Sequence, residues 1–263
     1  MRNIASKLLL LAVAVISVSA VPAPDGARVS VVVIDAGHGG FDPGTRGKAT
    51  LEKNVALRIS LRLGAYIERN FPDVRVVYTR KDDRYLELNE RAEIANKANA
   101  DLFICIHANS VPRPEFHGTE TYVMGLHRSE QNFEVSKREN SVMLLDENYK
   151  EKYEGFDPSS PESYILFSLT QSAYQESSLK FAGLVEQQFK QRAGRLSHGV
   201  KQAGFWVLWK TTMPSVLIET GFLTNAKEEI YLASAEGQDA IAASIYRAFR
   251  EYKSHMEAIN QVK

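Results

Sequence analysis

The sequence has little cysteine and no excess of charge of either sign. Its 263 residues include one cysteine, Cys105, so the chain forms neither an internal disulfide framework nor a cysteine-based zinc cluster. Its 32 basic residues balance its 32 acidic residues, whereas nucleic-acid-binding domains usually carry a basic excess or a basic stripe. We therefore expect no nucleic-acid partner, and any metal site must use histidine, aspartate or glutamate.

The chain also lacks an apolar run long enough to span a membrane comfortably near its N-terminus. The run at residues 8–16 is too short, follows a basic N-terminus and precedes small residues that end at Ala20. This pattern predicts a signal peptide over residues 1–20 and an exported protein, periplasmic or cell-wall associated, with no stable membrane span after processing. A buried N-terminal helix is the alternative, and it fits less well because residues 21–24 read Val-Pro-Ala-Pro, typical of a linker. We place that linker at residues 21–29.

Strand-like and helix-like segments alternate along the rest of the chain. Apolar runs predict strands at residues 30–34, 74–78, 102–106, 118–124, 205–209 and 215–218. Helical spacing of apolar residues predicts helices at residues 52–70, 88–98, 178–192 and 239–252. This alternation is typical of an α/β sheet with helices on both faces. With no repeat and no internal linker, residues 30–254 form one expected domain, followed by a C-terminal tail at 255–263.

A polar, charged stretch at residues 126–177 interrupts the alternation. It is about fifty residues long, and compact domains rarely contain so long a connection unless it has a function. From the residues alone it is either a mobile surface excursion or a functional insertion.

Three predicted strands run directly into a titratable residue. His38 follows the first strand, His107 ends an apolar strand and Glu219 ends the last one. The carboxyl ends of strands form the ligand crevice of open α/β sheets, so these side chains should meet there. Glu52 begins the first long helix, which starts at the same edge of the sheet.

These residue types suit a catalytic zinc site. Two imidazoles and one carboxylate hold zinc and leave one position open for water, whose pKa the metal lowers to about 7. A second carboxylate then moves a proton from the water to the leaving amine. We predict that His38, Glu52 and His107 bind Zn²⁺ and that Glu219 is the catalytic base. Each of them alone also fits an ordinary structural role, such as a helix-start carboxylate. The glycine-rich run at residues 37–44 lacks both common nucleotide-binding spacings.

The motifs that carry these residues occur in a specific order along the chain. They include Ile34-Asp35-Ala36-Gly37-His38-Gly39-Gly40, Glu52-Lys53-Asn54, Ile106-His107-Ala108-Asn109 and Pro214-Ser215-Val216-Leu217-Ile218-Glu219-Thr220-Gly221. In this combination the sequence resembles the zinc-dependent N-acetylmuramoyl-L-alanine amidases of the type-3 amidase family, over residues 31 to about 252.

The resemblance implies a single α/β domain with a six-stranded, mostly parallel sheet and helices on both faces. It implies zinc held by His38, Glu52 and His107, with Glu219 catalytic. The expected reaction is hydrolysis of the amide between N-acetylmuramic acid and the L-alanine of the peptidoglycan stem peptide, for cell-wall remodelling or daughter-cell separation.

The stretch at residues 126–177 has a parallel in the same family. Amidases that separate daughter cells carry an insertion there, with a helix that blocks the zinc until an activator protein displaces it. The resemblance implies a regulatory insertion with such a helix at residues 135–145, and Glu139 is the candidate autoinhibitory residue, with Glu134 and Glu147 as rivals. Residues 163–169 would be an apolar return segment, which docks on the domain or is gripped by the activator.

Two other functions stay open from the sequence. One is a zinc peptidase that acts on another cell-wall amide, because one fold hosts many chemistries. The other is a non-catalytic cell-wall binding module, against which the complete set of four candidate site residues argues. Arg80 and Arg91 also lie in family motifs, and we expect them to support the sheet edge and nearby loops rather than bind substrate.

Overall fold

The computed structural model describes residues 28–165 and 173–261 of the chain. The predicted signal peptide, most of the predicted linker and residues 166–169 of the predicted return segment lie outside this described part. Within it, no helix combines the length and the apolar character that a membrane crossing requires.

Six strands form one mostly parallel sheet. They are β1 (Val31–Ala36), β2 (Arg75–Tyr78), β3 (Leu102–Asn109), β4 (Thr119–Met124), β5 (Ser197–Ala203) and β6 (Ser215–Phe222). The order is β2-β1-β3-β6-β4-β5, and β4 runs antiparallel to β6 while the other neighbouring pairs are parallel. This confirms the predicted α/β class, and it brings the carboxyl ends of β1, β3 and β6 to one edge.

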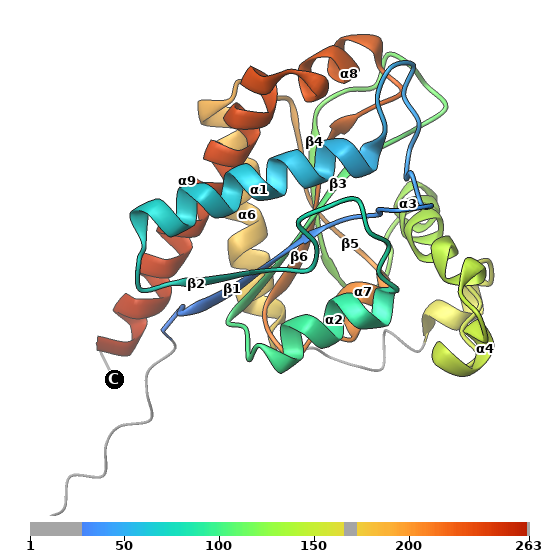
Figure 1. Cartoon of the computed structure of the whole chain (residues 1–263), viewed down its shortest axis with the longest axis horizontal. Helices are drawn as coiled ribbons and strands as arrows, with labels where there is room; N and C mark the ends of the chain where they lie inside the picture. Colours follow the sequence, from blue (N-terminus) through green and yellow to red (C-terminus); the bar gives the residue numbers. More distant parts are fainter. Residues whose placement is uncertain (1–27, 166–172, 262–263) are drawn as a thin grey trace, which may run out of the picture.

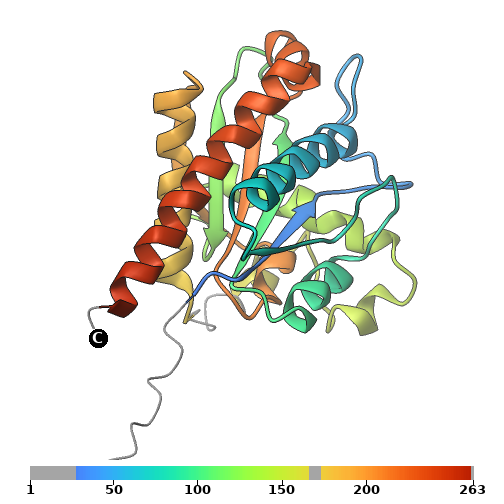
Figure 2. The same ribbon diagram turned by 60° about the vertical axis from the view of Figure 1, so that its left-hand side comes forward.

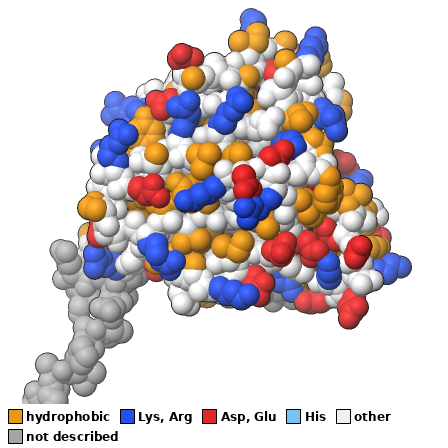
Figure 3. Space-filling model, viewed as in Figure 1, with side chains coloured by type: hydrophobic (Ala, Val, Ile, Leu, Met, Phe, Trp, Pro, Cys, Tyr) orange, Lys and Arg blue, Asp and Glu red, His pale blue; other side chains and the backbone are white. Residues whose placement is uncertain are grey.

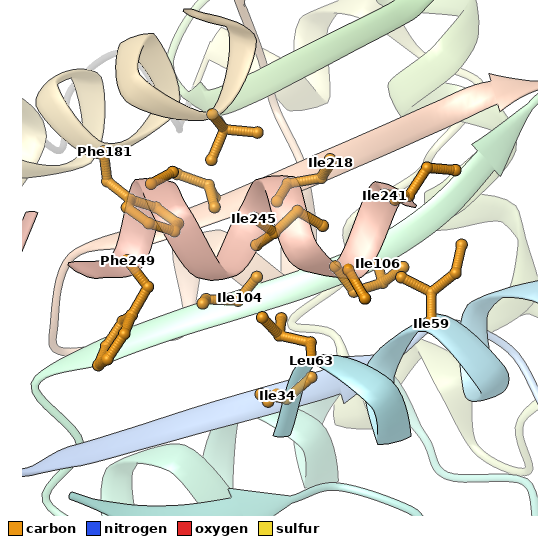
Figure 4. Packing of buried hydrophobic residues seen from close by; sticks show 14 of the residues in the cluster. Ile34, Ile59, Leu63, Ile104, Ile106, Phe181, Ile218, Ile241, Ile245 and Phe249 are labelled. Atoms are coloured by element: carbon orange, nitrogen blue, oxygen red, sulfur yellow. The ribbon is translucent and has the colours of Figure 1, made fainter. Parts of the chain in front are cut away.

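One face of the sheet is covered by α1 (Glu52–Asn70), α6 (Gln175–Arg192) and α9 (Ala235–Gln261) (Figures 1 and 2). Alternate strand residues point to this side, and Figure 4 shows Ile34, Ile104 and Ile218 packed against helix residues such as Phe181 and Phe249. These side chains are fully buried, so this layer forms a continuous, mostly aliphatic core.

The opposite face is covered by α2 (Leu88–Lys97), the short α7 (Trp206–Trp209) and the insertion. The insertion contains α3 (Glu130–Asn140), a 3₁₀ turn (Ser141–Leu145), α4 (Tyr149–Lys152) and a second 3₁₀ turn (Pro161–Tyr164). Phe133, Tyr153 and Tyr164 of the insertion are buried in a second core with Phe103 and Leu217 of the sheet. The insertion is therefore packed on the domain, and Figure 3 shows charged side chains over its outer surface.

One predicted strand is wrong, and two elements of the structure were not predicted. The predicted strand at residues 205–209 was wrong, because Trp206–Trp209 form one helical turn. Phe205, Trp206, Val207 and Leu208 are all buried, so their apolar pattern had no periodicity to separate a strand from a helix. The sequence pattern did not reveal β5, which lies at the sheet edge with mostly half-buried side chains, or α8 (Ala226–Ala233).

Several predicted helices have different bounds in the structure, and α6 begins at Gln175 rather than at residue 178. The expected helix at residues 135–145 begins earlier, where the Oγ of Ser129 caps α3 by accepting a hydrogen bond from the backbone N–H of Asn132. It then tightens into a 3₁₀ turn at Ser141. The closing helix, α9, extends the predicted 239–252 segment at both ends, so residues 255–261 of the expected tail are helical.

Candidate metal centre

His38 lies just beyond the carboxyl end of β1 in a loop with unusual backbone geometry. Its φ angle is 61°, and Gly39 and Gly40 also have positive φ. A Cβ on Gly39 would lie 2.1 Å from the carbonyl oxygen of Arg84, so only glycine fits there. The Nδ1 of His38 lies 2.8 Å from Asp42 Oδ2. Because a carboxylate can only accept, this contact favours a proton on Nδ1 and leaves the lone pair of Nε2 directed to the centre of the site.

Two buried arginines hold the His38 loop by its carbonyl groups. Arg80 donates to the carbonyls of Ala36 and Gly37, and Arg91 donates to those of Ala36 and His38. The prediction that these arginines support the sheet edge agrees with these contacts. They offset the strain of the loop and so determine where the His38 ring lies.

Glu52 is the first residue of α1 and is fully buried. Its Oε2 accepts a hydrogen bond of 2.7 Å from the backbone N–H of Thr45, and its Oε1 accepts one of 2.9 Å from that of Ala108. Burial alone would raise the pKa of Glu52, but the neighbouring His38 lowers it below its usual value. Glu52 is therefore an oriented carboxylate beside the two histidines.

His107 comes from β3, on the face of the sheet that the insertion covers. Its ring packs against Gly37, where an added Cβ would lie 2.4 Å from His107 Nε2. The Nδ1 atom faces Glu52 Oε1 at 3.0 Å. The close approach of the β1 loop to this ring explains why a glycine stands immediately before His38.

Four donor atoms converge on one point, from His38, Glu52, His107 and Glu139. His38 Nε2 lies 3.0 Å from Glu52 Oε1 and 3.3 Å from Glu139 Oε2, and His107 Nδ1 lies 3.0 and 3.1 Å from the same two oxygens. All four atoms lie within 4.8 Å of one another. Ligands at about 2.0–2.1 Å from a tetrahedral zinc ion are roughly 3.3 Å apart, so these residues fit such an ion.

The hydrogen-bond pattern supports the same interpretation. His38 Nε2 and Glu139 Oε2 are buried, and neither has a hydrogen-bond partner with acceptable geometry despite their short separation. Buried polar atoms are normally hydrogen-bonded. These two atoms are therefore free to bind a cation at the centre of the cluster.

Glu139 belongs to α3 and is the residue through which the insertion reaches the cluster. Its Oε2 faces both histidines, while its Oε1 accepts a hydrogen bond of 2.9 Å from Arg138. Burial alone would raise the pKa of Glu139, but Arg138 and His107 hold it well below its usual value. The rival Glu134 instead lies at the surface with Lys137, and Glu147 is exposed.

Glu219 ends the row of site residues on the sheet, paired in register with His107. It is fully buried and neither of its side-chain oxygens has a hydrogen-bond partner. Burial raises the pKa of Glu219 well above its usual value, and the charges of Glu139 and Glu52 raise it further. A buried carboxyl group without a hydrogen-bond partner, beside a candidate metal site, is suited to carry a proton during a reaction.

Sequence reasoning missed three residues at this site. Asp42 orients His38, and its spacing of four residues from that histidine was an available signal. Arg138 and Asn109 lie beside Glu219 and hydrogen-bond each other, but no local pattern links the insertion to β3.

The comparisons with known proteins agree with this geometry. The family model described as N-acetylmuramoyl-L-alanine amidase matches residues 32–251. The chain belongs to this amidase family. The match confirms the resemblance that the motifs indicated.

Relatives of the amidase family cover most of the chain. AmiA of Escherichia coli K12 is 33% identical over 225 residues, which make up 84% of the chain and 75% of AmiA. AmiC of Escherichia coli O6:H1 is 32% identical over 231 residues, but the chain spans only 53% of its length.

Solved amidase structures share the fold. The amidase AmiC2 of Nostoc punctiforme matches with a TM-score of 0.63 and 32% identity, over 86% of the chain and 97% of that structure. The amidase CwlD of Clostridioides difficile, solved in complex with the GerS lipoprotein, matches with a TM-score of 0.63 and 25% identity, over 86% and 98%.

Proposed function

We propose that the chain is a zinc-dependent N-acetylmuramoyl-L-alanine amidase that cleaves the bond between N-acetylmuramic acid and the L-alanine of peptidoglycan stem peptides. The convergence of four buried donor atoms, beside the unpaired Glu219, is the observation that carries the proposal. Membership of the family supports it, because relatives of similar sequence carry the same name. The chemistry requires two imidazoles, one carboxylate and a separate proton carrier, and all are present.

In the active enzyme, His38, Glu52 and His107 would hold the ion. Zinc in such a site acts as a Lewis acid and lowers the pKa of water to about 7. Glu219 takes a proton from the attacking water and delivers it to the amine nitrogen as the bond between carbonyl carbon and nitrogen breaks. Burial and the neighbouring Glu139 and Glu52 raise the pKa of Glu219, which favours the protonated form that delivers the proton.

Product and metal analysis test the proposal together. Purified protein should carry about one equivalent of zinc, an expectation from the single donor cluster in the described residues. Digestion of purified sacculi should release stem peptides with a new free amino group on L-alanine. Cleavage between other residues would contradict the amidase assignment and favour a peptidase.

We further propose that the insertion, residues 126–177, keeps the enzyme inactive at rest. Glu139 supplies a fourth donor where a catalytic zinc site needs an open position for water. A small cavity of about 20 Å³ remains beside the cluster, room for about one water molecule, between His38, Glu139, Val142 and Phe205. A polysaccharide strand does not fit there, so α3 must leave before substrate binds.

Two variants of the same helix test autoinhibition. Glu139→Ala removes both the fourth donor and the contacts that hold α3 against the two histidines, so it should raise dye release from labelled peptidoglycan above that of the unchanged protein. Glu130→Ala is the matched control, because Glu130 lies on α3 but is exposed and away from the cluster. Equal activity of the Glu139→Ala variant and the unchanged protein would count against autoinhibition.

An activator protein that displaces α3 is the partner that this arrangement needs. Leu144 and Leu145, directly after α3, are exposed apolar side chains that such a protein could contact. The related CwlD structure contains a bound lipoprotein, GerS, which shows that an amidase of this fold does bind a protein partner.

The proposed substrate lies outside the cytoplasm. Peptidoglycan lies outside the inner membrane, so we propose that the protein is exported to the periplasm or the cell wall. Mass spectrometry of the mature N-terminus would test the predicted signal peptide, and retention of residues 1–20 in the secreted protein would contradict it.

A further inference from the structure

Arg138 contacts several groups of the catalytic domain, and these contacts are not needed for Glu139 to occupy the candidate metal site. Its Nη1 donates to the carbonyl oxygen of Ser110 at 3.0 Å, and its Nη2 donates to Asn109 Oδ1 at 2.9 Å. The same Nη2 lies 3.7 Å from Glu219 Oε1. One side chain from the insertion thus joins three acceptors that belong to the catalytic domain.

Those acceptors are oriented by the domain itself. Asn109 is fully buried on β3, and its Nδ2 donates to Glu120 Oε2 at 3.1 Å. Glu120 is also buried on β4, where Lys201 and the hydroxyl of Tyr122 hold its two oxygens. Because a carboxylate accepts but does not donate, the amide NH₂ of Asn109 must face Glu120. The Oδ1 of Asn109 is therefore aimed at the site, whether or not Arg138 is there.

A buried acceptor needs a donor when α3 has left. Without Arg138, Asn109 Oδ1 keeps only the backbone N–H of its neighbour Ser110, and Glu219 keeps no protein partner. Water or a substrate N–H then replaces the guanidinium, and a substrate that closes over the site must supply a donor to avoid leaving these acceptors unsatisfied.

We infer that Asn109 is a substrate-binding residue whose side-chain oxygen accepts a hydrogen bond from the stem peptide, at the position that Arg138 occupies in the resting enzyme. This inference rests on the proposed amidase function. In the resting enzyme, the guanidinium of Arg138 occupies the position of the substrate's amine side. The carboxylate of Glu139 occupies the position of the attacking water. Glu120 and Lys201 are positioning residues, because they act through Asn109.

The direction of the peptide follows from the reaction. Glu219 delivers its proton to the amine nitrogen, so that nitrogen lies next to Glu219, where the guanidinium of Arg138 is found. Asn109 Oδ1 accepts from the same Nη2 that faces Glu219, so it lies within one peptide unit of the amine nitrogen. Because the amine nitrogen itself receives the proton of Glu219, we assign to Asn109 the next N–H along the peptide, between the first and second stem residues.

An open groove continues from this point along the same path. It is lined by Ser110, Pro112 and Arg113 on one side and by α3 residues, including Glu134 and Arg138, on the other. The remainder of the stem peptide has an exit route there, and the departure of α3 would widen it.

Peptide binding tests the inference separately from catalysis. The probe is a synthetic stem tetrapeptide with an N-terminal L-alanine, titrated calorimetrically into the full zinc-loaded chain carrying Arg138→Ala and Glu139→Ala. Adding Asn109→Ala should weaken its binding about fivefold, the effect of one hydrogen bond. Unchanged affinity would overturn the inference, as would failure of the parent variant to bind the peptide. Dye release from peptidoglycan by the parent variant reports on the proposed function independently.

A second peptide keeps the test decisive if the Asn109→Ala variant folds poorly. In this peptide an ester replaces the amide between the first and second residues, which removes the N–H and little else. The parent variant should bind the ester about fivefold more weakly than the amide, whereas the Asn109→Ala variant should not distinguish them. If the parent binds both equally, Asn109 has no such partner and the inference fails.

Discussion

The two faces of the sheet are built from the same strands but carry different kinds of core. The face under α1, α6 and α9 is a continuous aliphatic layer in which Thr119 and Thr121 bond to the buried Glu186. The face under α2, α3 and α7 has more aromatic side chains. It also carries a row of buried titratable groups near the carboxyl ends of the strands, where His107 and Glu219 are in register. Figure 4 shows only the first of these layers, where no charge interrupts the labelled side chains.

The difference shows how one domain separates stability from chemistry. Burying an unpaired carboxylate such as Glu219 costs free energy, which the aliphatic face must offset. The alternation of side chains along each strand keeps the two functions apart, because consecutive residues of one strand point to opposite faces of the sheet. Changes on the aliphatic face should therefore alter folding, and changes on the other face should alter activity.

The largest effect should follow removal of the proton carrier from the functional face. In a chain already released by Glu139→Ala, Glu219→Gln should lower the rate of dye release by about 10²–10⁴-fold. The zinc content should not change, and the melting temperature should not fall, because an amide of the same size replaces a carboxyl group that has no hydrogen-bond partner. Activity equal to that of the released parent would remove Glu219 from the mechanism.

A change on the aliphatic face should give the opposite result. Phe181→Ala removes a fully buried ring between α6 and the sheet and should lower the free energy of unfolding by about 3–5 kcal/mol. Urea denaturation measures this loss. Well below the new melting temperature, zinc content should stay at the level of the unchanged protein, and loss of zinc there would show that the faces are not independent.

The buried pair of Asp35 and Arg91 tests the edge between core and site. The carboxylate lies 2.9 Å from the guanidinium, and Asp35→Asn would leave Arg91 uncompensated, at a cost of about 3 kcal/mol. Burial acts to raise the pKa of Asp35, but Arg91 lowers it below the unfolded value of 3.8. The stabilisation from this pair is therefore complete above pH 3.8 and is lost as the pH falls towards the folded-state pKa.

Denaturation midpoints of both proteins between pH 7 and pH 3 check this pH dependence. The unchanged protein should lose its advantage over the Asp35→Asn variant as the pH falls. A difference that stays constant to pH 3 would show that the charge of Asp35 does not matter.

The smallest effect should come from a residue that touches no candidate ligand atom. Asp42 holds the far nitrogen of the His38 ring, so Asp42→Ala should weaken zinc binding by about 10–100-fold without unfolding the protein. Competition with a chromophoric chelator measures that affinity. Unchanged affinity would mean that the glycine-rich loop alone orients the ring.

Much of the fold could be predicted because its signals are local. Buried parallel strands such as residues 102–106 are continuous apolar runs, and amphipathic helices such as α1 show helical spacing. The edge strand β5 and the helical turn α7 were not predicted, for opposite reasons. The strand has few apolar residues, whereas the turn consists entirely of apolar residues.

The candidate site also has a part that the sequence predicted and a part that it left open. His38, Glu52, His107 and Glu219 could be named from the sequence because each one closes or opens a recognisable element, and the sheet topology then brings such ends to a single edge. The choice of Glu139 over Glu134 and Glu147 remained open, since all three lie in the same polar stretch. Only the packing of Phe133 and Tyr164 against the sheet decides which face of α3 turns inward.

The sequence by itself thus determined the fold class, the family and the residues able to hold a metal, because these depend on periodicity and on motifs within short segments. The tertiary structure alone decided that Arg138 meets Asn109 and Glu219, and which carbonyl groups of the His38 loop the two arginines hold. Those contacts join segments far apart in the chain. Their partners are selected by distance and by the need of buried polar groups for hydrogen bonds, which no local pattern records.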